Sequence, residues 1–241
     1  MPPRLFIDRP LMTAGATFAL PAGPARHVQV LRLQPGAALT LFDGAGGESA
    51  ATVLQMGRSE VTVRLGERTE VDRELPFQVT LALGMPANER MDTLVEKATE
   101  LGASTIQPLL CERSVLRLSG ERADKKVAHW HAVALAACEQ SGRTRVPLIA
   151  PVQTLPQWLR ELPAGALSRW MLSFRDARPV AALTVAPAGV VCLSGPEGGL
   201  SSDEEAAARA AGFEPVSLGP RVLRAETAPL ALLAFLALRA G

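Results

Sequence analysis

The sequence predicts an α/β protein in which a small N-terminal β-barrel or sandwich precedes a largely parallel sheet. Up to about residue 70, apolar and polar residues alternate in short runs that end in turn signals, as in half-buried strands. From Pro76 onward, strand-like runs alternate with runs of helical periodicity, which is typical of a parallel sheet covered on both faces. The charged stretch ERTEVDREL lies between the two patterns, so we expect domains at residues 1–72 and 73–241.

The first domain is expected to hold four strands and one short helix. Turns are predicted at Pro35-Gly36 and Asp43-Gly44, between strand-like runs. The stretch ARHVQVLRL interrupts these runs with apolar residues at near-helical spacing. We therefore expect strands at residues 5–7, 38–42, 50–54 and 61–65, and a helix at residues 25–33.

The second domain is expected to alternate strands with helices. The clearest helix begins at Arg90, because apolar residues recur at helical spacing from Met91 to Leu101. Gly102 follows at the position where a left-handed cap belongs. Strands are expected at residues 78–83, 105–110, 170–174, 190–194 and 215–218, and helices near residues 88–101, 121–140, 154–161, 201–211 and 226–239.

Composition excludes several classes of protein. With 241 residues, of which 48% are hydrophobic, the chain can bury a sizeable core. The N-terminus MPPRLFIDRP lacks the apolar core of a signal peptide, and the longest apolar run, Ala228 to Leu238, is too short to cross a bilayer. We expect a cytoplasmic protein without membrane contact.

The three cysteines are far apart and only three histidines are present, so no metal is expected. The net charge of +1 indicates nothing about a nucleic-acid partner.

Two segments, VCLSGPEGGLSSDE at 191–204 and VSLGPRVLRAETA at 216–228, each lead an apolar strand through a Gly-Pro loop into a helix. Ligands of open α/β sheets bind outside the carboxyl ends of the strands, where both loops belong. The first loop is no dinucleotide fingerprint, because its glycine spacing is wrong and proline lacks an N–H. It is either a rigid loop that approaches a flat ligand closely or a plain turn before a helix capped by Ser201 or Ser202.

Charged residues mark the second loop. Arg221, Arg224 and Glu226 interleave with Val222 and Leu223 between a strand end and a fully apolar helix. Charged residues on a hinge this short usually form ion pairs, either with each other or with a ligand. Both interpretations stay open at this level.

Six stretches together resemble one family, the bacterial methyltransferases of the SPOUT superfamily that methylate N3 of a uridine in 16S ribosomal RNA. They are SGPEGGLSSDE, LGPRVLRAETA, ERMDTLVEKATELGASTIQPLLCERS, AACEQSGRTRVP, HVQVLRLQPG and LFDGAGG. The similarity covers nearly the whole chain, in order. In the segment PANER, the chain offers Arg90 where family members often have lysine.

The resemblance implies a PUA-like RNA-binding barrel at residues 1–72 and a trefoil-knotted methyltransferase domain at 73–241. It implies S-adenosylmethionine as the cofactor, with no metal, and the 16S rRNA of the small ribosomal subunit as the partner. The knot would bring both Gly-Pro loops to one ligand. The implied cofactor-binding residues are Leu172, Gly195, Pro196, Glu197, Gly198, Gly199, Leu218, Gly219, Arg221, Val222 and Leu223.

The resemblance also implies catalytic roles for two residues. Arg224 would stabilise the negative charge that develops on the uracil ring when N3 loses its proton. Glu226 would orient Arg224 or accept the proton, although Glu197 and a water molecule are equally open as the base. RNA contacts are assigned to Arg4, Arg9, Arg26, Arg32, Gln140 and Arg143, against the alternative that these residues form an ordinary solvated face.

The last helix, in APLALLAFLALRA, is apolar on all sides and must be buried on more than one of them. It lies either under the sheet or in a homodimer interface, and the resemblance favours the dimer.

Two other functions compete. A 2′-O-ribose methyltransferase of the same superfamily would need asparagine in its signature loops, yet Asn88 is the only asparagine. The second is a non-catalytic RNA-binding or ribosome-assembly protein.

Overall fold

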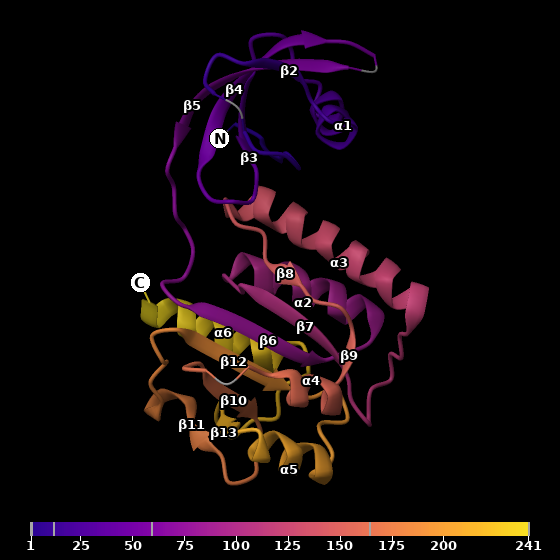
Figure 1. The fold of residues 1–241 in the computed structure, drawn as a ribbon, viewed down its shortest axis with the longest axis vertical. Coiled ribbons are helices and arrows are strands. Elements are labelled where there is room, and N and C mark those ends of the chain that lie inside the picture. Colours follow the sequence, from indigo (N-terminus) through magenta and orange to yellow (C-terminus); the bar gives the residue numbers. More distant parts are fainter. Residues whose placement is uncertain (1, 12, 59, 164, 241) are drawn as a thin grey trace. The chain divides into compact units, whose positions relative to one another are not determined.

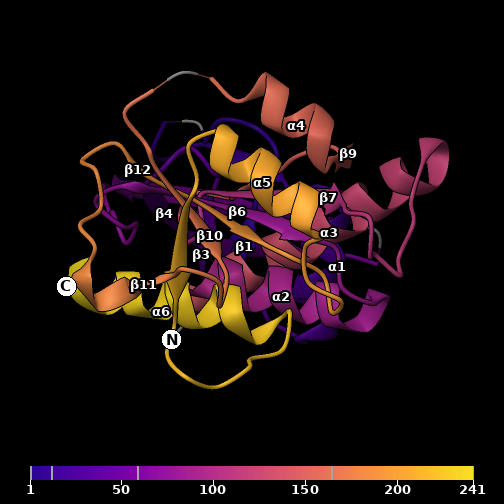
Figure 2. The ribbon, with the colours of Figure 1, turned by 90° about the horizontal axis from the view of Figure 1, so that it is seen from below.

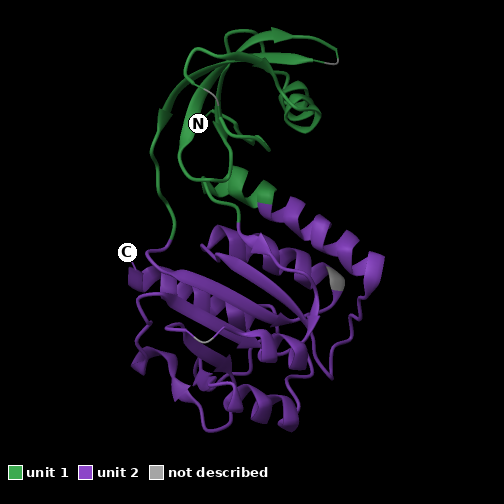
Figure 3. Cartoon of the chain, in the orientation of Figure 1, with its two compact units in different colours: residues 1–74, 135–146 green, residues 75–134, 147–241 purple. Residues whose placement is uncertain are grey.

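A computed structural model describes residues 2–11, 13–58, 60–163 and 165–240 (Figure 1). The chain forms two compact units (Figure 3). Unit 1 contains residues 1–74 and 135–146, and unit 2 contains residues 75–134 and 147–241. The segment 135–146, which includes the end of a long helix, is therefore grouped with the N-terminal residues. The domain limits of 1–72 and 73–241 stay a prediction.

Unit 1 is a five-stranded sheet in the order β1-β3-β4-β5-β2, with one short helix. Only β1 and β3 pair in parallel among these neighbours. Alternate residues of the long strands, such as Val53, Val61 and Val63, are fully buried, which is the pattern of a sheet with one covered face. The elements are β1 (Arg4–Phe6), β2 (Thr17–Ala19), α1 (Ala22–Val30), β3 (Ala38–Phe42), β4 (Glu48–Met56) and β5 (Val61–Thr69).

The four strands expected in this region are present, whereas β2 was not predicted, because three residues carry no measurable alternation. Helix α1 begins earlier than expected. Pro24 lies in its first turn, where the missing N–H of proline costs no hydrogen bond. The helix ends before Arg32, which adopts the left-handed conformation with φ 53°.

Unit 2 is built on a parallel sheet in the order β11-β13-β10-β12-β6-β7-β8, with β9 also paired to β7. All of the described strand pairs of this sheet run parallel. The strands are β6 (Gln78–Gly84), β7 (Thr105–Leu110), β8 (Leu148–Ile149), β9 (Gln153–Thr154), β10 (Ser168–Leu172), β11 (Arg178–Pro179), β12 (Gly189–Ser194) and β13 (Glu214–Ser217).

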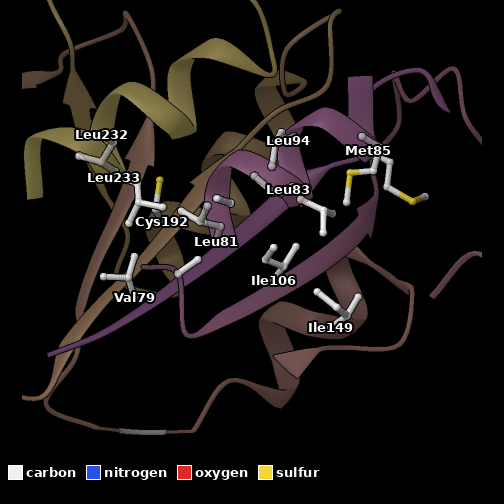
Figure 4. Close-up of a cluster of buried hydrophobic side chains, with 14 of the residues drawn as sticks. Val79, Leu81, Leu83, Met85, Leu94, Ile106, Ile149, Cys192, Leu232 and Leu233 are labelled. Carbon is white, nitrogen blue, oxygen red and sulfur yellow. The ribbon is translucent and has the colours of Figure 1, made fainter. Parts of the chain in front are cut away.

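Helices cover both faces of this sheet. Val190 and Cys192 of β12 pack in one cluster with α2 and α6 (Figure 4), whereas Val191 and Leu193 pack in a second cluster with α4 and α5. Figure 2 shows α4 and α5 on one side of the strands and α2 and α6 on the other. The strands read as continuous apolar runs because both of their faces are buried. The helices are α2 (Asn88–Glu100), α3 (Gly120–Ser141), α4 (Leu155–Glu161), α5 (Ser202–Ala210), α6 (Thr227–Ala240) and the 3₁₀ helix η1 (Val180–Ala182).

The strands and helices expected from residue 76 onward all occur within a few residues of their expected limits. The short elements β8, β9, β11 and η1 were not predicted, since two or three residues are too few to show a period. None of the helices that the structure describes is long and apolar enough to span a membrane.

The order of the strands determines the path of the second Gly-Pro loop. Strand β13 lies beside β10, and β10 lies beside β12, but α6 packs against β12 and α2. Residues 218–226 connect β13 to α6 and therefore pass back across the carboxyl end of β10. This crossover brings the second loop to the same edge of the sheet as the first loop, which follows β12.

Candidate active site

A cavity of about 490 Å³ lies in unit 2 at the carboxyl ends of β10, β12 and β13. Both Gly-Pro loops line it, as expected for ligand sites of open α/β sheets. Gly198 and Gly219 are the two predicted cofactor-binding residues that are not part of the wall. The predicted residues that line it are Leu172, Gly195, Pro196, Glu197, Gly199, Leu218, Arg221, Val222 and Leu223, together with the predicted catalytic residue Arg224.

Glycine is required where the first loop meets the strands. A Cβ on Gly84, the last residue of β6, would lie 2.5 Å from Cδ of Pro196, and a Cβ on Gly195 would lie 2.8 Å from the backbone N of Leu200. The N–H of Gly199, at φ 70°, donates to the carbonyl of Pro196 over 2.8 Å. The loop is therefore a tight turn pressed against β6, with its backbone held at the cavity.

Ser201 caps the helix that follows this turn. Its hydroxyl accepts from the N–H of Glu204, and the carboxylate of Glu204 accepts in return from the N–H of Ser201, so a complete capping box starts α5. Of the two serines considered from sequence, the cap is Ser201. The turn and the ligand interpretations of this loop are thus compatible, because the capped helix fixes the turn that lines the cavity.

The two arginines of the second loop have free guanidinium groups. Within the described part of the chain, neither Arg221 nor Arg224 forms an ion pair or a side-chain hydrogen bond, and both are exposed. The carbonyl of Arg224 accepts from the N–H groups of Thr227 and Ala228, at 2.9 and 3.0 Å, and so closes the first turn of α6. The backbone of Arg224 is fixed while its side chain remains available to a ligand.

Glu226 pairs with a residue outside its loop. Oε1 of Glu226 lies 3.8 Å from Nε of Arg90, in the first turn of α2, and Nη1 of Arg90 donates to Oε1 of Glu197 over 3.3 Å. Glu197 also accepts from the N–H of Ala87 at 3.0 Å. The other carboxylate oxygen of Glu226, Oε2, is buried, and none of the residues in the described ranges donates a hydrogen bond to it. An Arg–Glu pair within the loop, which the sequence left open, is not formed by the residues described.

The cavity carries a surplus of positive charge that the net charge of the chain does not reveal. Its wall includes the four arginines Arg90, Arg175, Arg221 and Arg224 and the two glutamates Glu197 and Glu205, and Glu226, outside the wall, pairs with Arg90, so one positive charge remains in excess. Such a surplus suits an anionic partner.

Sequence reasoning missed several wall residues. Phe174 and Arg175 follow β10, and Arg90 follows β6. The rule that ligands bind at the carboxyl ends of parallel strands applies to these two strands as well and would have indicated these positions.

The structure gives two of the predicted RNA-binding residues a role inside unit 1. The side chain of Arg4 is 7% exposed, forms an ion pair with Glu48 and lies 5.1 Å from the centre of the Phe42 ring. The side chain of Arg143 is 5% exposed and forms a bidentate ion pair with Glu74, with Nε at 3.1 and 3.2 Å from the two oxygens. Both guanidinium groups are covered and held by carboxylates of unit 1, with Glu48 shared between Arg4 and Arg73, so we do not propose Arg4 and Arg143 as RNA contacts.

The other four predicted RNA-binding residues of unit 1 are exposed. Arg9 lies over the ring of Phe18, with its guanidinium carbon 4.3 Å from the ring centre. For Arg26, Arg32 and Gln140, none of the described residues forms a hydrogen bond or an ion pair with the side chain. These side chains are free to bind an external partner.

Glu139, at the start of the EQSGR stretch, stabilises unit 1. Its carboxylate accepts from the N–H of Phe6 over 2.9 Å. Burial raises the pKa of Glu139, and the hydrogen bond from Phe6 opposes that rise. Glu139, near the end of α3, therefore contributes a contact inside the unit.

The three cysteines are buried free thiols. Burial raises the pKa of Cys111 and of Cys192 to about 12, and that of Cys138 to about 11, so all three stay protonated at neutral pH. Across the described ranges, no group of three or more His, Cys, Asp or Glu side chains is arranged to hold a metal ion.

Two family models match the chain in the order of its two sequence patterns. An RNA methyltransferase PUA domain matches residues 25–66, and an RNA methyltransferase domain matches residues 73–237. The chain therefore belongs to the RNA methyltransferases that carry a PUA domain, and its fold is the one predicted, a PUA-like domain followed by a trefoil-knotted, SPOUT-type methyltransferase domain.

Curated relatives narrow this class to the ribosomal RNA small subunit methyltransferase E family, to which the chain belongs. The relative from Synechocystis is 35% identical over 224 residues, which cover 91% of this chain and 72% of the relative. The relative from Bacillus subtilis is 30% identical over 89% of this chain and 87% of its own length.

Two solved structures have the same fold as this chain. Ribosomal RNA small subunit methyltransferase E from Neisseria gonorrhoeae, bound to S-adenosylmethionine, is 36% identical, with a TM-score of 0.92 over 98% of this chain and 96% of that one. A Legionella pneumophila methyltransferase in complex with the same cofactor is 34% identical, with a TM-score of 0.94 over 99% of this chain and 98% of that one.

Proposed function

We propose that this protein transfers a methyl group from S-adenosylmethionine to N3 of a specific uridine in the 16S rRNA of the small ribosomal subunit. The observation that carries the proposal is the cavity at the sheet edge, where both Gly-Pro loops meet and where no described residue pairs with the guanidinium of Arg221 or Arg224. Family membership supplies the substrate class, and two proteins of the same fold hold the cofactor.

The wall of the cavity suits S-adenosylmethionine. Its volume of about 490 Å³ lies in the range of small-molecule sites, and the turn at Gly195 and Gly199 places backbone groups directly at its surface. Leu172, Leu218 and Leu223 would cover the flat faces of the adenine. The sulfonium of the cofactor supplies an activated methyl group, so the protein contributes mainly position and electrostatics.

Arg224 is the proposed stabiliser of the transition state. The imide N3–H of uridine is a weak acid, so negative charge must develop on the ring carbonyls as the proton leaves. The backbone carbonyl of Arg224 closes the first turn of α6 at the cavity wall, and its exposed guanidinium is free to donate to such a ring carbonyl. Glu226, Glu197 and a water molecule are the candidate proton acceptors.

Unit 1 supplies the proposed RNA-binding domain, centred on the PUA-like residues 1–72. Arg9, Arg26 and Arg32, together with Gln140, are exposed and suited to contacts with phosphate and sugar groups. Such contacts position the RNA without specifying its sequence. Recognition of the target uridine then falls to the cavity and its surroundings in unit 2.

The proposed enzyme is a cytoplasmic homodimer that uses the outer side of α6. Leu232, Leu233 and Leu236 fill the core of unit 2, but Leu238 is 83% exposed and Phe235 is only half-buried. Leu232 is therefore unsuited to test the interface, because a charge there would destroy the core. Replacing Leu238 by aspartate should yield a folded monomer in light scattering, and a monomeric wild type at micromolar concentration would contradict the proposal.

The decisive experiment is mass spectrometry of nucleosides from small-subunit RNA, with and without the gene. We expect 3-methyluridine only in cells that have the gene. Loss of a 2′-O-methylated nucleoside in cells without the gene would instead indicate a ribose methyltransferase. Identical nucleosides in both kinds of cell would indicate a non-catalytic RNA-binding protein. Calorimetry should detect binding of S-adenosylmethionine that a chelator does not abolish, because no metal takes part.

A further inference from the structure

We propose that Arg90 is a positioning residue that holds Glu226 so that its second carboxylate oxygen, Oε2, accepts a hydrogen bond from an N–H group of a bound reactant. The inference rests on the proposed methyltransferase function and assigns a role to one group of that site. It also favours Glu226 over Glu197 as the acceptor of a ligand proton.

Arg90 joins two loops that are far apart in the chain. It lies in the cavity wall, donates to Glu197 of the first Gly-Pro loop over 3.3 Å, and lies 3.8 Å from Glu226 at the end of the second. Its side chain is 41% exposed, whereas that of Glu226 is 18% exposed. One guanidinium on α2 thus keeps two carboxylates in place at the same edge of the sheet.

Glu197 and Glu226 differ in which carboxylate oxygen can still accept a hydrogen bond. Oε1 of Glu197 already accepts from the N–H of Ala87 and from Arg90. Among the residues that the structure describes, Glu226 forms an ion pair with Arg90 alone, through Oε1, and its covered Oε2 has no hydrogen-bond partner. A buried acceptor without a donor costs free energy, and such groups in native proteins call for an explanation such as a catalytic role.

A bound reactant can supply the missing donor. Glu226 is not itself part of the cavity wall, but its neighbours in the chain Arg224, Ala225 and Ala228 line it, so the covered Oε2 lies next to the cavity. Two N–H donors belong to the proposed reaction, the ammonium group of the cofactor and the imide N3–H of uridine. In the second case the N3–H proton passes to Glu226, N3 forms its bond to the methyl carbon, and the electron pair of the broken S–C bond stays on sulfur.

The test compares Arg90→Ala, Glu226→Gln and the double variant with wild type. Cofactor affinity is measured by calorimetry, and methylation of small subunits is measured as a single-turnover rate. We expect each single variant to lose at least tenfold in one of these quantities, and the double variant to lose less than the product of the two single losses, because Arg90 acts in part through Glu226. Loss of affinity assigns Oε2 to the ammonium group, and loss of rate alone assigns it to the imide.

Lys97→Ala is the matched control. Lys97 lies on the same helix, is 43% exposed and holds the two carboxylates Glu96 and Glu100, each at 2.7 Å, but it is not part of the cavity wall. Its replacement should leave affinity and rate within twofold of wild type. Arg90→Lys should restore only part of the loss, because a point charge does not hold two carboxylates as a planar fork does.

Melting temperatures of the cofactor-free variants test the bridge independently of activity. Arg90→Ala should lower the melting temperature less in the Glu226→Gln background than in wild type. Additive melting temperatures, losses of rate that multiply in the double variant, or full affinity and rate in Glu226→Gln would each overturn the inference. A wild-type protein that neither binds the cofactor nor methylates RNA would overturn the proposed function instead, and the melting temperatures would still decide on the bridge.

Discussion

In unit 1, Arg4 and Arg143 are almost completely covered and paired with Glu48 and Glu74, whereas in unit 2 Arg221 and Arg224 stand at a cavity without a carboxylate partner among the described residues. All are arginines of a chain that resembles one family along nearly its whole length. Their roles differ because folding brings a carboxylate within reach of one pair and not of the other. A paired guanidinium stabilises the fold, and an unpaired one at a cavity is available to a ligand.

The largest effect is expected for the unpaired class. Arg224→Ala should lower the single-turnover rate of methylation on the order of a hundredfold to a thousandfold, because one preorganised donor to the developing charge is lost. The melting temperature should stay near that of wild type, since no described residue pairs with this side chain. Arg224→Lys should rescue poorly. A rate within tenfold of wild type, with unchanged cofactor affinity, would make Arg224 structural.

Replacing a buried arginine that is paired with a carboxylate should lower the stability of the fold. Arg143→Ala leaves the carboxylate of Glu74, 14% exposed, without its partner and should lower the free energy of unfolding by about 3 kcal/mol. Urea unfolding followed by circular dichroism measures this change. Replacing both residues, as Arg143→Met with Glu74→Leu, should recover part of the loss. If Arg143→Ala weakens RNA binding and leaves the free energy of unfolding unchanged, Arg143 contacts RNA and does not belong with the arginines that stabilise the fold.

A smaller effect is expected for the exposed arginines of unit 1. Arg26→Ala should weaken RNA binding several-fold and lower the slope of log affinity against log salt by about 1, because one phosphate contact is lost. Arg4→Ala is the comparison in the same unit and should leave that slope unchanged, since Arg4 is paired with Glu48. Titrations of small-subunit RNA at several salt concentrations distinguish the two.

The smallest effect concerns pH. Burial raises the pKa of Glu48, but hydrogen bonds and charges from Arg73 and Arg4 outweigh burial, so its pKa lies below the ordinary 4.5. Because the folded state favours the carboxylate, its contribution to stability is present above pH 4.5 and is lost as the pH falls through the lower folded value. The melting temperature of wild type should exceed that of Glu48→Gln at pH 7, and the difference should shrink as the pH falls below 4.5. A constant difference would show that the charge of Glu48 is not the cause.

The amino-acid sequence was sufficient to predict the long elements and the place of the site. Helix α2 and strands β6 and β12 follow from apolar periodicity, because the period records which faces are buried. Both Gly-Pro loops could be assigned to the carboxyl ends of strands, since loop chemistry and strand direction are local properties. The short elements β8, β9 and β11 were beyond its reach, because two residues carry no period.

Which charged side chains are paired depends on how the elements pack in three dimensions. Arg143 and Glu74 are 69 residues apart, and Arg90 and Glu197 are 107 residues apart, so no local pattern connects them. A salt bridge depends on a distance of a few ångströms between side chains, and that distance is set by the packing of whole elements. The sequence could therefore show that arginines gather near the second Gly-Pro loop, while the fold alone determined that Arg224 is free and that Arg90 is bound to two carboxylates.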